Sequence, residues 1–472
     1  MLLLALLCSC DPASVDPADS GDGGASDGGL SDGGGSDGGG SDGGGSEPLE
    51  IPELSLELHP EINTLLVARW TQEQPVEQSW LTFSFEDQVI TTPSRALEPG
   101  EQREVLLGVP PETPVSVSLS LERGSEAITG PLVEGSTAEL PADLVVPDFV
   151  QWDPAASSTQ RYLLTAVDVG RSNFYGPFYV LILDRQGRVV WYESVDDSRL
   201  TWQPRPSLDG SHLVYEAATV YVFTGGVEPS IKRLTLDLEQ QEETFIDGFG
   251  LAWAELPDGG FVFDYAESGY EFHIERLSPE GDRDRIWSCY PWMEPFSRAY
   301  WACAPNAIVY NPERNSLLYS MFETSTVVEV DLDSGELLHH FGQVPGSYAF
   351  DPDQTVFELQ HYPNWTAAGT LLVSTHQPGV RNRQFIREYE VDDAAETLRQ
   401  IWKVDLSSEY YAQYAGGALR LDNGNTMVTV GTDGAILELD TDGAIVWELD
   451  WNGHLVGNVT ALDDLYALNQ GW

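Results

Sequence analysis

The second half of the chain repeats one pattern of strand, turn and strand, and this repeat constrains the fold more than any other feature. Each copy has an apolar strand, a turn rich in Asp and Gly, and a second strand that ends at a large ring. Clear copies begin at Tyr179, Thr326 and Ala435, and a looser copy begins at Phe272. A hairpin of this kind cannot bury its own apolar face, so the copies must stack on one another.

A second turn pattern lies between these hairpins and gives the period of the repeat. It is centred on Gly210, Gly259, Asn315, Gly369 and Gly424, and each turn precedes a short strand. Successive turns are 49, 56, 54 and 55 residues apart. About 50 residues for four strands is typical of propeller blades. The sequence therefore predicts an all-β protein with a six-bladed β-propeller over residues 155–472, and the alternative is an ordinary sandwich with coincidental hairpins.

The N-terminus predicts export and lipidation. Residues 1–10 form a short apolar segment that ends in Leu7-Cys8-Ser9-Cys10, and the small residue before Cys10 is the feature that a lipoprotein signal peptidase requires. We therefore expect Cys10 to carry the lipid, while Cys8 is the poorer candidate because Leu7 precedes it. The basic segment of an ordinary export signal is missing. The predicted location is the bacterial cell envelope, either in the periplasm or at the outer surface.

Residues 11–49 are predicted to be a disordered tether, because Gly, Ser and Asp dominate them and they have almost no apolar content. The whole chain has 23 basic and 76 acidic residues and a net charge of −53. Nucleic acid is excluded as a partner, since phosphate binding needs clusters of Lys and Arg. No long apolar segment follows the signal, so the lipid is the only membrane contact that we expect.

Two cysteines remain after the signal, and they bracket an aromatic loop. Export makes a disulfide between Cys289 and Cys303 plausible, although the sequence does not settle whether it forms. The loop between them is too long and too aromatic for a simple turn. It is predicted to be either the rim of a pocket or a plug on the propeller axis, through the side chains of Trp292, Phe296, Tyr300 and Trp301.

Residues 50–148 predict a separate small β-domain. Four segments alternate apolar and polar residues with period two, and turn residues separate them. The stretch from Leu106 to Ser118 resembles a late-strand motif of fibronectin type III domains, and Trp70 would then be a core residue of an early strand. The expected fold is a fibronectin-III-like or immunoglobulin-like β-sandwich, and it contains no catalytic constellation.

The propeller half resembles the bacterial arylsulfate sulfotransferases that need no nucleotide sulfate donor. Three stretches carry the resemblance: 305–320, 357–373 and 418–447. In that family a histidine takes the sulfuryl group from an aryl sulfate and passes it to a phenol. Because this transfer builds negative charge on the sulfate oxygens, cations and hydrogen-bond donors must converge there. A neutral imidazole is a competent nucleophile.

When the family's motifs are matched residue by residue to this sequence, only part of the catalytic set is present. The Gln-His motif falls on Gln360-His361, which makes His361 the candidate nucleophile, and Asn306 matches the family's sulfate-binding asparagine. The family's other histidine falls on Ala304, and its arginine falls on Phe322. Its upstream His-His-Asp sequence falls on Gly250-Leu251-Ala252, so both histidines and the aspartate are missing. The alternative for His361 is a histidine that only packs within a blade.

Other cationic side chains are candidates to replace the missing donors, namely His376, Arg381, Arg383 and Arg298. For His376 the simpler interpretation is a packing residue. The histidines show no metal-ligand spacing, and no phosphate-binding or dinucleotide-binding motif is visible, so neither a metal nor a cofactor is expected.

Three hypotheses follow for function. The first is a lipid-anchored propeller with an eroded catalytic set that binds an aromatic or phenolic molecule, either sulfated or not, or a surface partner. The second is an active sulfotransferase that works through a sulfo-histidine at His361. The third is a purely structural surface module. The oligomeric state is not predicted.

Overall fold

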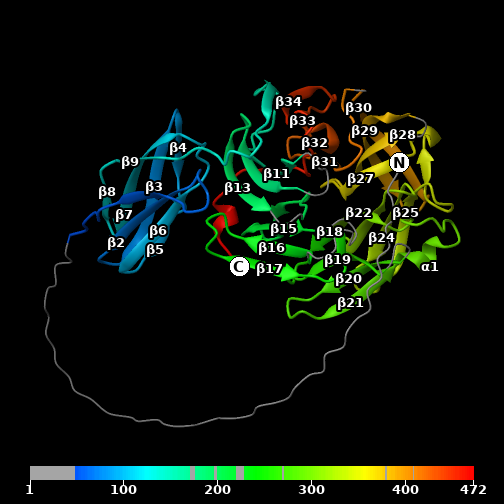
Figure 1. The fold of residues 1–472 in the computed structure, drawn as a ribbon, viewed down its shortest axis with the longest axis horizontal. Helices are drawn as coiled ribbons and strands as arrows, with labels where there is room; N and C mark the ends of the chain where they lie inside the picture. The colour runs from blue at the N-terminus through cyan, green and yellow to red at the C-terminus, as the bar shows by residue number, and fades with distance from the viewer. Residues whose placement is uncertain are drawn as a thin grey trace, which may run out of the picture. The chain divides into compact units, whose positions relative to one another are not determined.

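We describe the chain from a computed structural model that covers residues 48–170, 176–195, 199–218, 228–267, 271–377, 380–407 and 409–472. Cys10 and nearly all of the expected tether lie outside these residues. Strands make up almost all of the regular structure (Figure 1). The described helical segments are short: α1 (Cys289–Met293) and the 3-10 turns η2 (Asp353–Thr355), η3 (Gly431–Asp433) and η4 (Ala467–Asn469). None of these described helices has the length and apolar content needed to span a lipid bilayer.

Two antiparallel sheets form the N-terminal part. One has the strand order β1-β2-β6, and the other has the order β4-β3-β7-β8 with β5 beside β3 and β9 beside β7. Alternate residues of β3 are buried, as the period-two pattern predicts, and Trp70 is buried in β2. The strands are β1 (Ser55–Leu58), β2 (Leu66–Gln72), β3 (Val76–Phe85), β4 (Gln88–Thr91), β5 (Arg95–Leu97), β6 (Gly100–Leu106), β7 (Pro114–Arg123), β8 (Glu126–Thr129) and β9 (Val133–Ser136).

The described strands from residue 148 onward form six further sheets of four or five strands. Their orders are β13-β12-β11-β35, β14-β15-β16-β17, β18-β19-β20-β21, β22-β23-β24-β25, β26-β30-β29-β28-β27 and β10-β34-β33-β32-β31. Neighbouring strands are antiparallel except for β26 and β30. Each hairpin copy found in the sequence becomes two neighbouring strands of one sheet, namely β12-β13, β20-β21, β24-β25 and β33-β34. The chain is therefore all-β with a propeller-like succession of sheets.

The strand bounds in the first three of these sheets are β11 (Tyr162–Asp168), β12 (Phe178–Asp184), β13 (Val189–Val195), β14 (Arg205–Pro206), β15 (Leu213–Ala217), β16 (Ser230–Leu234), β17 (Gln241–Phe245), β18 (Phe249–Glu255), β19 (Phe261–Ala266), β20 (Phe272–Leu277), β21 (Arg283–Ser288) and β35 (Thr460–Leu462). Those in the other three are β10 (Asp148–Trp152), β22 (Pro305–Asn311), β23 (Ser316–Met321), β24 (Thr326–Asp331), β25 (Leu337–Gly342), β26 (Ala349–Asp351), β27 (Glu358–Trp365), β28 (Leu371–Gln377), β29 (Val380–Asp392), β30 (Thr397–Asp405), β31 (Gly416–Arg420), β32 (Thr426–Val430), β33 (Ala435–Leu439) and β34 (Ile445–Asp450).

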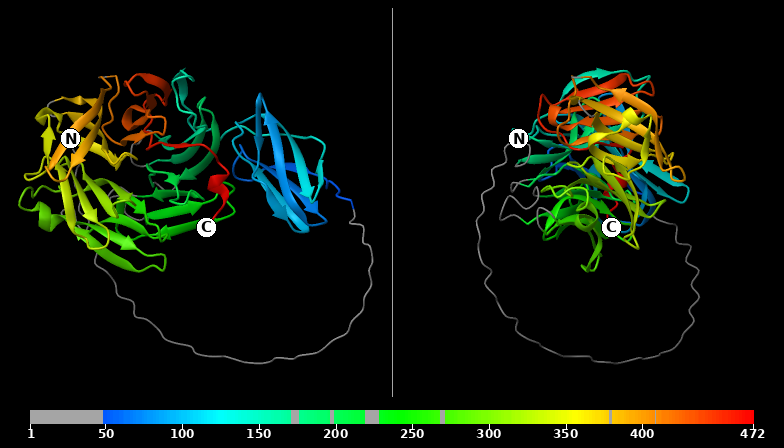
Figure 2. Two further views of the ribbon diagram at one scale, coloured as in Figure 1. Left: turned by 180° about the vertical axis from the view of Figure 1, so that it is seen from behind. Right: turned by 90° about the vertical axis from the view of Figure 1, so that its right-hand side faces the viewer.

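The ends of this region pair with distant strands. β35 is the last strand of the chain, yet it pairs with β11, with Leu462 opposite Tyr162. β10 precedes the six sheets and pairs with β34 in the last of them. These two pairings link segments far apart in the sequence, and Figure 2 shows the C-terminal segment beside the strands near residue 200.

The large rings that end the hairpins connect neighbouring sheets. The indole Nε1 of Trp191 donates a hydrogen bond to Leu236 O in the next sheet along the chain, at 2.7 Å. Trp447, in the last sheet, donates to Arg185 O in the first at 2.7 Å. Burial of a Trp is favourable when its N–H finds a partner. The repeated ring therefore both fills the space between sheets and satisfies a turn carbonyl.

Hydrogen bonds also join the N-terminal sheets to the rest of residues 49–472, which form one compact unit. The hydroxyl of Tyr466, just before η4, donates to Val105 O at 3.0 Å and accepts from Leu107 N at 3.2 Å. The hydroxyl of Thr64 donates to Val190 O at 2.9 Å. All three bonds are buried.

Candidate functional site

The candidate site lies around β27, which contacts β22 of the preceding sheet and β31 of the following sheet (Figure 1). β22 carries Asn306, β27 carries Gln360 and His361, and β31 begins at Gly416. The pairing of β27 with β28 is interrupted on both sides of His361. Leu359 and Tyr362 have φ angles of 51° and 39°, in the left-handed region that non-glycine residues rarely adopt. Such strained positions cluster at binding and catalytic sites.

Asn306 and His361 contact each other directly. The Asn306 amide nitrogen donates to Gln360 O at 2.7 Å and lies 3.2 Å from His361 Nδ1. Because the bond to a carbonyl fixes this nitrogen as the donor, Nδ1 must be the acceptor, and the network assigns the imidazole proton to Nε2. Asn306 Oδ1 and His361 Nε2 are buried, and neither meets a partner with ordinary hydrogen-bond geometry among the described residues.

Burial keeps the imidazole of His361 neutral. Its side chain is almost fully buried, and this burial lowers its pKa from 6.5 to about 3. The nearby His376 lowers the pKa further, while a backbone interaction with Gln413 acts weakly in the opposite direction. No Arg or Lys in the described part of the chain forms a hydrogen bond or an ion pair with His361.

Two other residues close around the imidazole. The ring of Phe322 lies 5.1 Å from that of His361, centroid to centroid. A Cβ atom at Gly416 would lie 3.3 Å from the His361 ring, which is tighter than ordinary contact. The neighbouring Gln360 points away from the site, because its amide nitrogen is held by Ser320 Oγ, Met321 O and Thr326 O. Gln360 therefore fixes the strand and does not face a ligand.

The four side chains considered as replacements for the missing donors differ in their position relative to His361. His376 is buried, with its ring 6.3 Å from that of His361, and its Nδ1 lies 3.2 Å from Arg383 O. The Arg383 guanidinium pairs with Asp405 at 2.5 Å. Arg298 is largely exposed and pairs with Glu294. The side chain of Arg381 lies outside the described part of the structure.

The structure adds a buried carboxylate that the sequence patterns did not reveal. Asp264 in β19 accepts hydrogen bonds from Leu251 N and Ala252 N, at 2.7 and 2.6 Å. Its second oxygen occupies the space that a side chain at Gly250 would need. Burial raises the pKa of Asp264 to about 7. Gly250 and Leu251 are the positions on which the resemblance places the family's histidine pair, and at Gly250 the Asp264 carboxyl group takes the space that a side chain would need.

A cavity of about 180 Å³ lies beside the site, lined by Tyr362, the residue after His361. Gln203 and Thr429 are buried in its wall, and their Oε1 and Oγ1 atoms have no hydrogen-bond partner among the described residues. Arg205 is its charged residue, and it donates to Trp253 O while its guanidinium stacks 3.7 Å from the Trp253 ring. The rest of the wall is mostly apolar and comprises Pro204, Pro206, Gly417, Ala418, Leu419, Met427, Asn458, Val459 and Thr460.

The aromatic loop packs against side chains of its own and the next sheet. Cys289 and Cys303 form a disulfide. Trp292 packs against Trp287 and His340, and Trp301 packs against Phe272. Phe296 and Tyr300 are exposed. No residue of this loop lines the cavity beside His361. Within the described residues, no group of three His, Cys, Asp or Glu side chains is placed to hold a metal ion.

Comparisons with known proteins give one family match. Residues 299–436 match the family model described as arylsulfotransferase (ASST). This match confirms the resemblance found in the sequence and contains both Asn306 and His361. A comparison with curated proteins finds no match.

Solved structures with a related chain path are remote in sequence. A protein of unknown function from Bacteroides caccae is 13% identical, with a TM-score of 0.44, and the match covers 65% of this chain and 100% of that one. The periplasmic gluconolactonase PpgL of Pseudomonas aeruginosa is 13% identical, with a TM-score of 0.40 and coverage of 82% and 100%. Virginiamycin B lyase from Staphylococcus aureus is 11% identical, with a TM-score of 0.36 and coverage of 64% and 100%. These likenesses carry no argument about activity.

Proposed function

We propose that this chain, whose residues 299–436 match the arylsulfotransferase family model, binds an uncharged aromatic molecule in the cavity beside Tyr362 and does not transfer sulfuryl groups. In this proposal the six sheets are the blades of a six-bladed propeller, and the two N-terminal sheets form a β-sandwich beside it. Lipidated Cys10 and the tether hold the protein at the cell envelope.

The observation that carries the proposal is that, among the described residues, no Arg or Lys side chain forms a hydrogen bond or an ion pair with His361. A sulfuryl group in transfer carries negative charge on its oxygens, and buried donors must already be in place to stabilise it. Phe322 contacts the His361 ring at the position of the family's arginine, and among the described candidates Arg383 and Arg298 are engaged by carboxylates. Bringing a sulfate anion to a buried site without a paired cation costs several kcal/mol, of the order of 2–7 even for uncharged polar groups.

The hydrogen-bond network of the imidazole supports the same conclusion. A nucleophilic Nε2 needs a free lone pair, whereas the contact with Asn306 assigns the proton to Nε2. In this tautomer His361 is a hydrogen-bond donor to a ligand oxygen. The intact Asn306–His361 contact and the strained backbone around it favour the second candidate function, an active sulfotransferase, if the tautomer changes on substrate binding.

The cavity beside Tyr362 has the size and chemistry for one aromatic ring. An apolar cavity of about 150 Å³ is known to hold benzene, and this cavity measures about 180 Å³. Its single charged residue, Arg205, lies near the carboxyl groups of Glu216 and Glu255. Burial raises the pKa of both carboxyl groups, and the charge of Arg205 acts against this rise. An uncharged ring with one hydrogen-bonding group therefore suits this cavity better than an anion does.

The deciding experiment measures transfer and binding on the same protein. A chromogenic aryl sulfate and excess phenol are incubated with the wild-type chain and with His361→Ala. We expect no transfer above background in either protein, and saturable binding of uncharged benzyl alcohol by calorimetry that Met427→Trp abolishes by filling the cavity. Sulfuryl transfer that disappears in His361→Ala would establish the active enzyme and overturn the proposal.

A gain-of-function variant tests whether the missing family residues account for the loss of sulfuryl transfer. Ala304→His combined with Phe322→Arg restores two side-chain types of the family pattern beside His361. If the site is eroded by these two changes, the double variant should acquire weak transfer that again depends on His361. The matched control is Ala302→His, a neighbouring position whose buried side chain packs in the same cluster.

The lipid anchor is tested separately. We expect Cys10→Ser to move the protein from the membrane fraction to the soluble fraction, while Cys8→Ser leaves it in the membrane fraction. Equal behaviour of the two variants would exclude Cys10 as the lipidated residue.

A further inference from the structure

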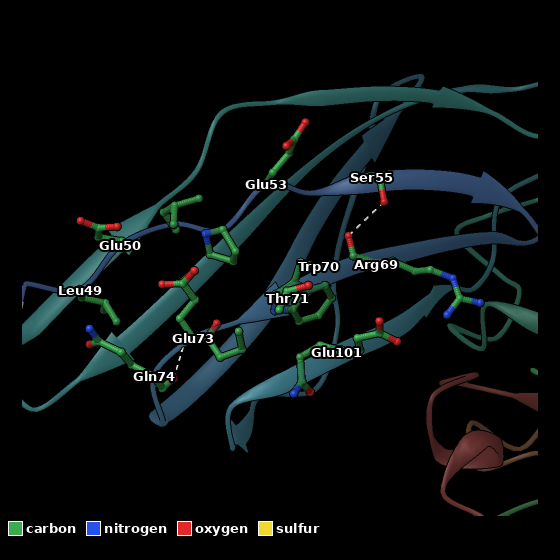
Figure 3. A pocket seen from close by; sticks show the side chains of 14 residues that line it. Leu49, Glu50, Glu53, Ser55, Arg69, Trp70, Thr71, Glu73, Gln74 and Glu101 are labelled. Carbon is green, nitrogen blue, oxygen red and sulfur yellow. Dashed lines mark hydrogen bonds between the residues drawn. The ribbon is translucent and has the colours of Figure 1, made fainter.

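Exposed apolar side chains gather on one strand, β10. The exposed fractions of Phe149, Val150 and Trp152 are 45%, 51% and 38%. An exposed apolar patch on a soluble protein often marks an interaction site. By contrast, the cavity of about 560 Å³ between the start of β1, the end of β2 and β6 has exposed glutamates on its rim (Figure 3), and acidic side chains alone do not make a binding site. β10 is therefore the stronger candidate for a further interaction.

β10 forms the outer edge of its sheet. It pairs with β34 on one side, and no strand of the described structure pairs with its other side. An edge strand offers unpaired backbone N–H and C=O groups to another chain, and proteins usually guard such edges with charged side chains. The edge strand β21 follows this rule, because Arg283, Asp284 and Arg285 are exposed on it. All five residues of β10 are exposed, and only Asp148 among them is charged.

One face of β10 is apolar. Phe149 is paired with Leu449, and Trp152 is paired with Trp447. Directly paired residues of two strands point to the same face, and so do residues two positions apart in one strand. Because the pairing shifts between Phe149 and Gln151, the side chains of Phe149 and Trp152 share one face although they are three positions apart.

The opposite face of β10 is acidic. Asp148 is paired with Asp450, and Gln151 is paired with Glu448. Like charges directly opposite each other on neighbouring strands are unfavourable. Burial raises the pKa of Glu448, and the charge of Asp450 adds to this rise, while a hydrogen bond from Tyr410 opposes it. A basic side chain on a strand added beside β10 would lie next to Asp148 on this face and reduce the repulsion.

We propose that the free edge of β10 binds an extended segment of a partner protein as an added strand, and that this segment alternates apolar with basic side chains. Backbone hydrogen bonds would hold the added strand, and its two faces would match the two faces of β10. The apolar side chains would cover Phe149 and Trp152, and the basic ones would lie beside Asp148. A second copy of the chain fits less well, because β10 contains no basic residue.

The test is calorimetric titration of the full chain at about 0.3 M salt, which screens the long-range attraction of any cation to this acidic protein. The first probe is a short peptide in which Val and Lys alternate. The second is the same peptide with methyl groups on its backbone nitrogens, and the third has Glu in place of Lys. We expect the first peptide to bind at least about tenfold more tightly than either of the others. Equal binding of the first and second peptides would mean that charge alone attracts them, and it would overturn the proposal.

Variants locate the binding site on β10. Phe149→Thr combined with Trp152→Thr keeps residues that favour strands and removes the apolar face, so the first peptide should bind about tenfold more weakly. The matched control is Phe245→Thr, which removes an exposed aromatic ring from the edge strand β17 and should leave binding unchanged. Equal binding by the double variant and this control would overturn the proposal.

A second variant removes only a charge. Asp148→Asn keeps a side-chain oxygen that can accept the hydrogen bond from Asn452, and we expect about threefold weaker binding of the first peptide. Unchanged binding by Asp148→Asn would contradict the basic character of the partner. Sedimentation of the wild type without peptide tests the other occupant. Self-association that Phe149→Thr with Trp152→Thr abolishes would assign this edge to a second copy and overturn the proposal.

Discussion

At the scale of single residues, His361 is predicted to make the protein sensitive to acid. Its pKa is lowered from 6.5 to about 3 in the folded state, mainly by burial. As the pH falls below about 6.5, the unfolded chain gains a proton that the folded state does not accept, so the free energy of unfolding falls by about 1.4 kcal/mol per pH unit. We expect this loss between about pH 6 and pH 4.

The measurement is urea unfolding of the wild type and His361→Gln at about pH 7 and pH 5. His361→Gln removes this titration, so its stability relative to the wild type should improve by about 2 kcal/mol at the lower pH. The same sample labelled with ¹⁵N should show a neutral imidazole with the proton on Nε2. An imidazole that titrates near its usual pKa would contradict the geometry described for the site.

The titration of Asp264 should lower the free energy of unfolding as the pH rises, the opposite of the effect of His361. Burial raises its pKa from 3.8 to about 7, although the backbone N–H groups of Leu251 and Ala252 oppose this shift. The folded state therefore holds a proton that the unfolded chain has released, and the contribution to stability is lost as the pH rises from about 4 through 7. Asp264→Asn keeps an acceptor oxygen and does not titrate. Its stability relative to the wild type should rise by about 1.4 kcal/mol per pH unit over that range, measured by urea unfolding, and parallel pH profiles would refute the assignment.

At the scale of structural elements, the disulfide Cys289–Cys303 closes the aromatic loop that contains α1. The two cysteines are 14 residues apart, and closing a loop of this length contributes about 3 kcal/mol in the chain-entropy model. We expect the variant Cys289→Ala, Cys303→Ala to lose about 2–3 kcal/mol in urea unfolding. Reductant should lower the stability of the wild type to the same value and leave the variant unchanged. A reductant effect on both proteins would point to another cause.

Sequence patterns predicted where the structural elements lie along the chain, but they did not predict which of these elements contact one another. The hairpins at Tyr179, Thr326 and Ala435 are predictable because their period and turn residues are local properties. The pairing of β35 with β11 is not, since β35 has only three residues and its partner lies almost 300 residues earlier. The aromatic loop shows the same limit, because its residues indicate burial without indicating which surface buries them. The structure places Trp292 and Trp301 against Trp287 and Phe272.

At the scale of the whole molecule, Tyr466 is predicted to couple the N-terminal sheets to the remaining sheets. Its buried hydroxyl bonds to both Val105 O and Leu107 N. Tyr466→Phe would leave these two backbone groups unsatisfied, at a cost of about 1–3 kcal/mol. Calorimetry should show one cooperative transition for the wild type and a lower or divided transition for the variant. Unchanged unfolding would mean that this contact does not couple the two parts.

The sequence by itself determined the all-β class, the repeat, and the Asn306–His361 pair, because these depend on local periodicity and on short motifs. It also showed that Ala304 and Phe322 stand where a related family has cationic side chains. Only the tertiary structure decided the chemistry of the site. The pKa of His361, the proton on its Nε2 and the role of Asp264 depend on burial and on neighbours from other strands. A pattern along one strand cannot report a contact that forms only when separate sheets meet.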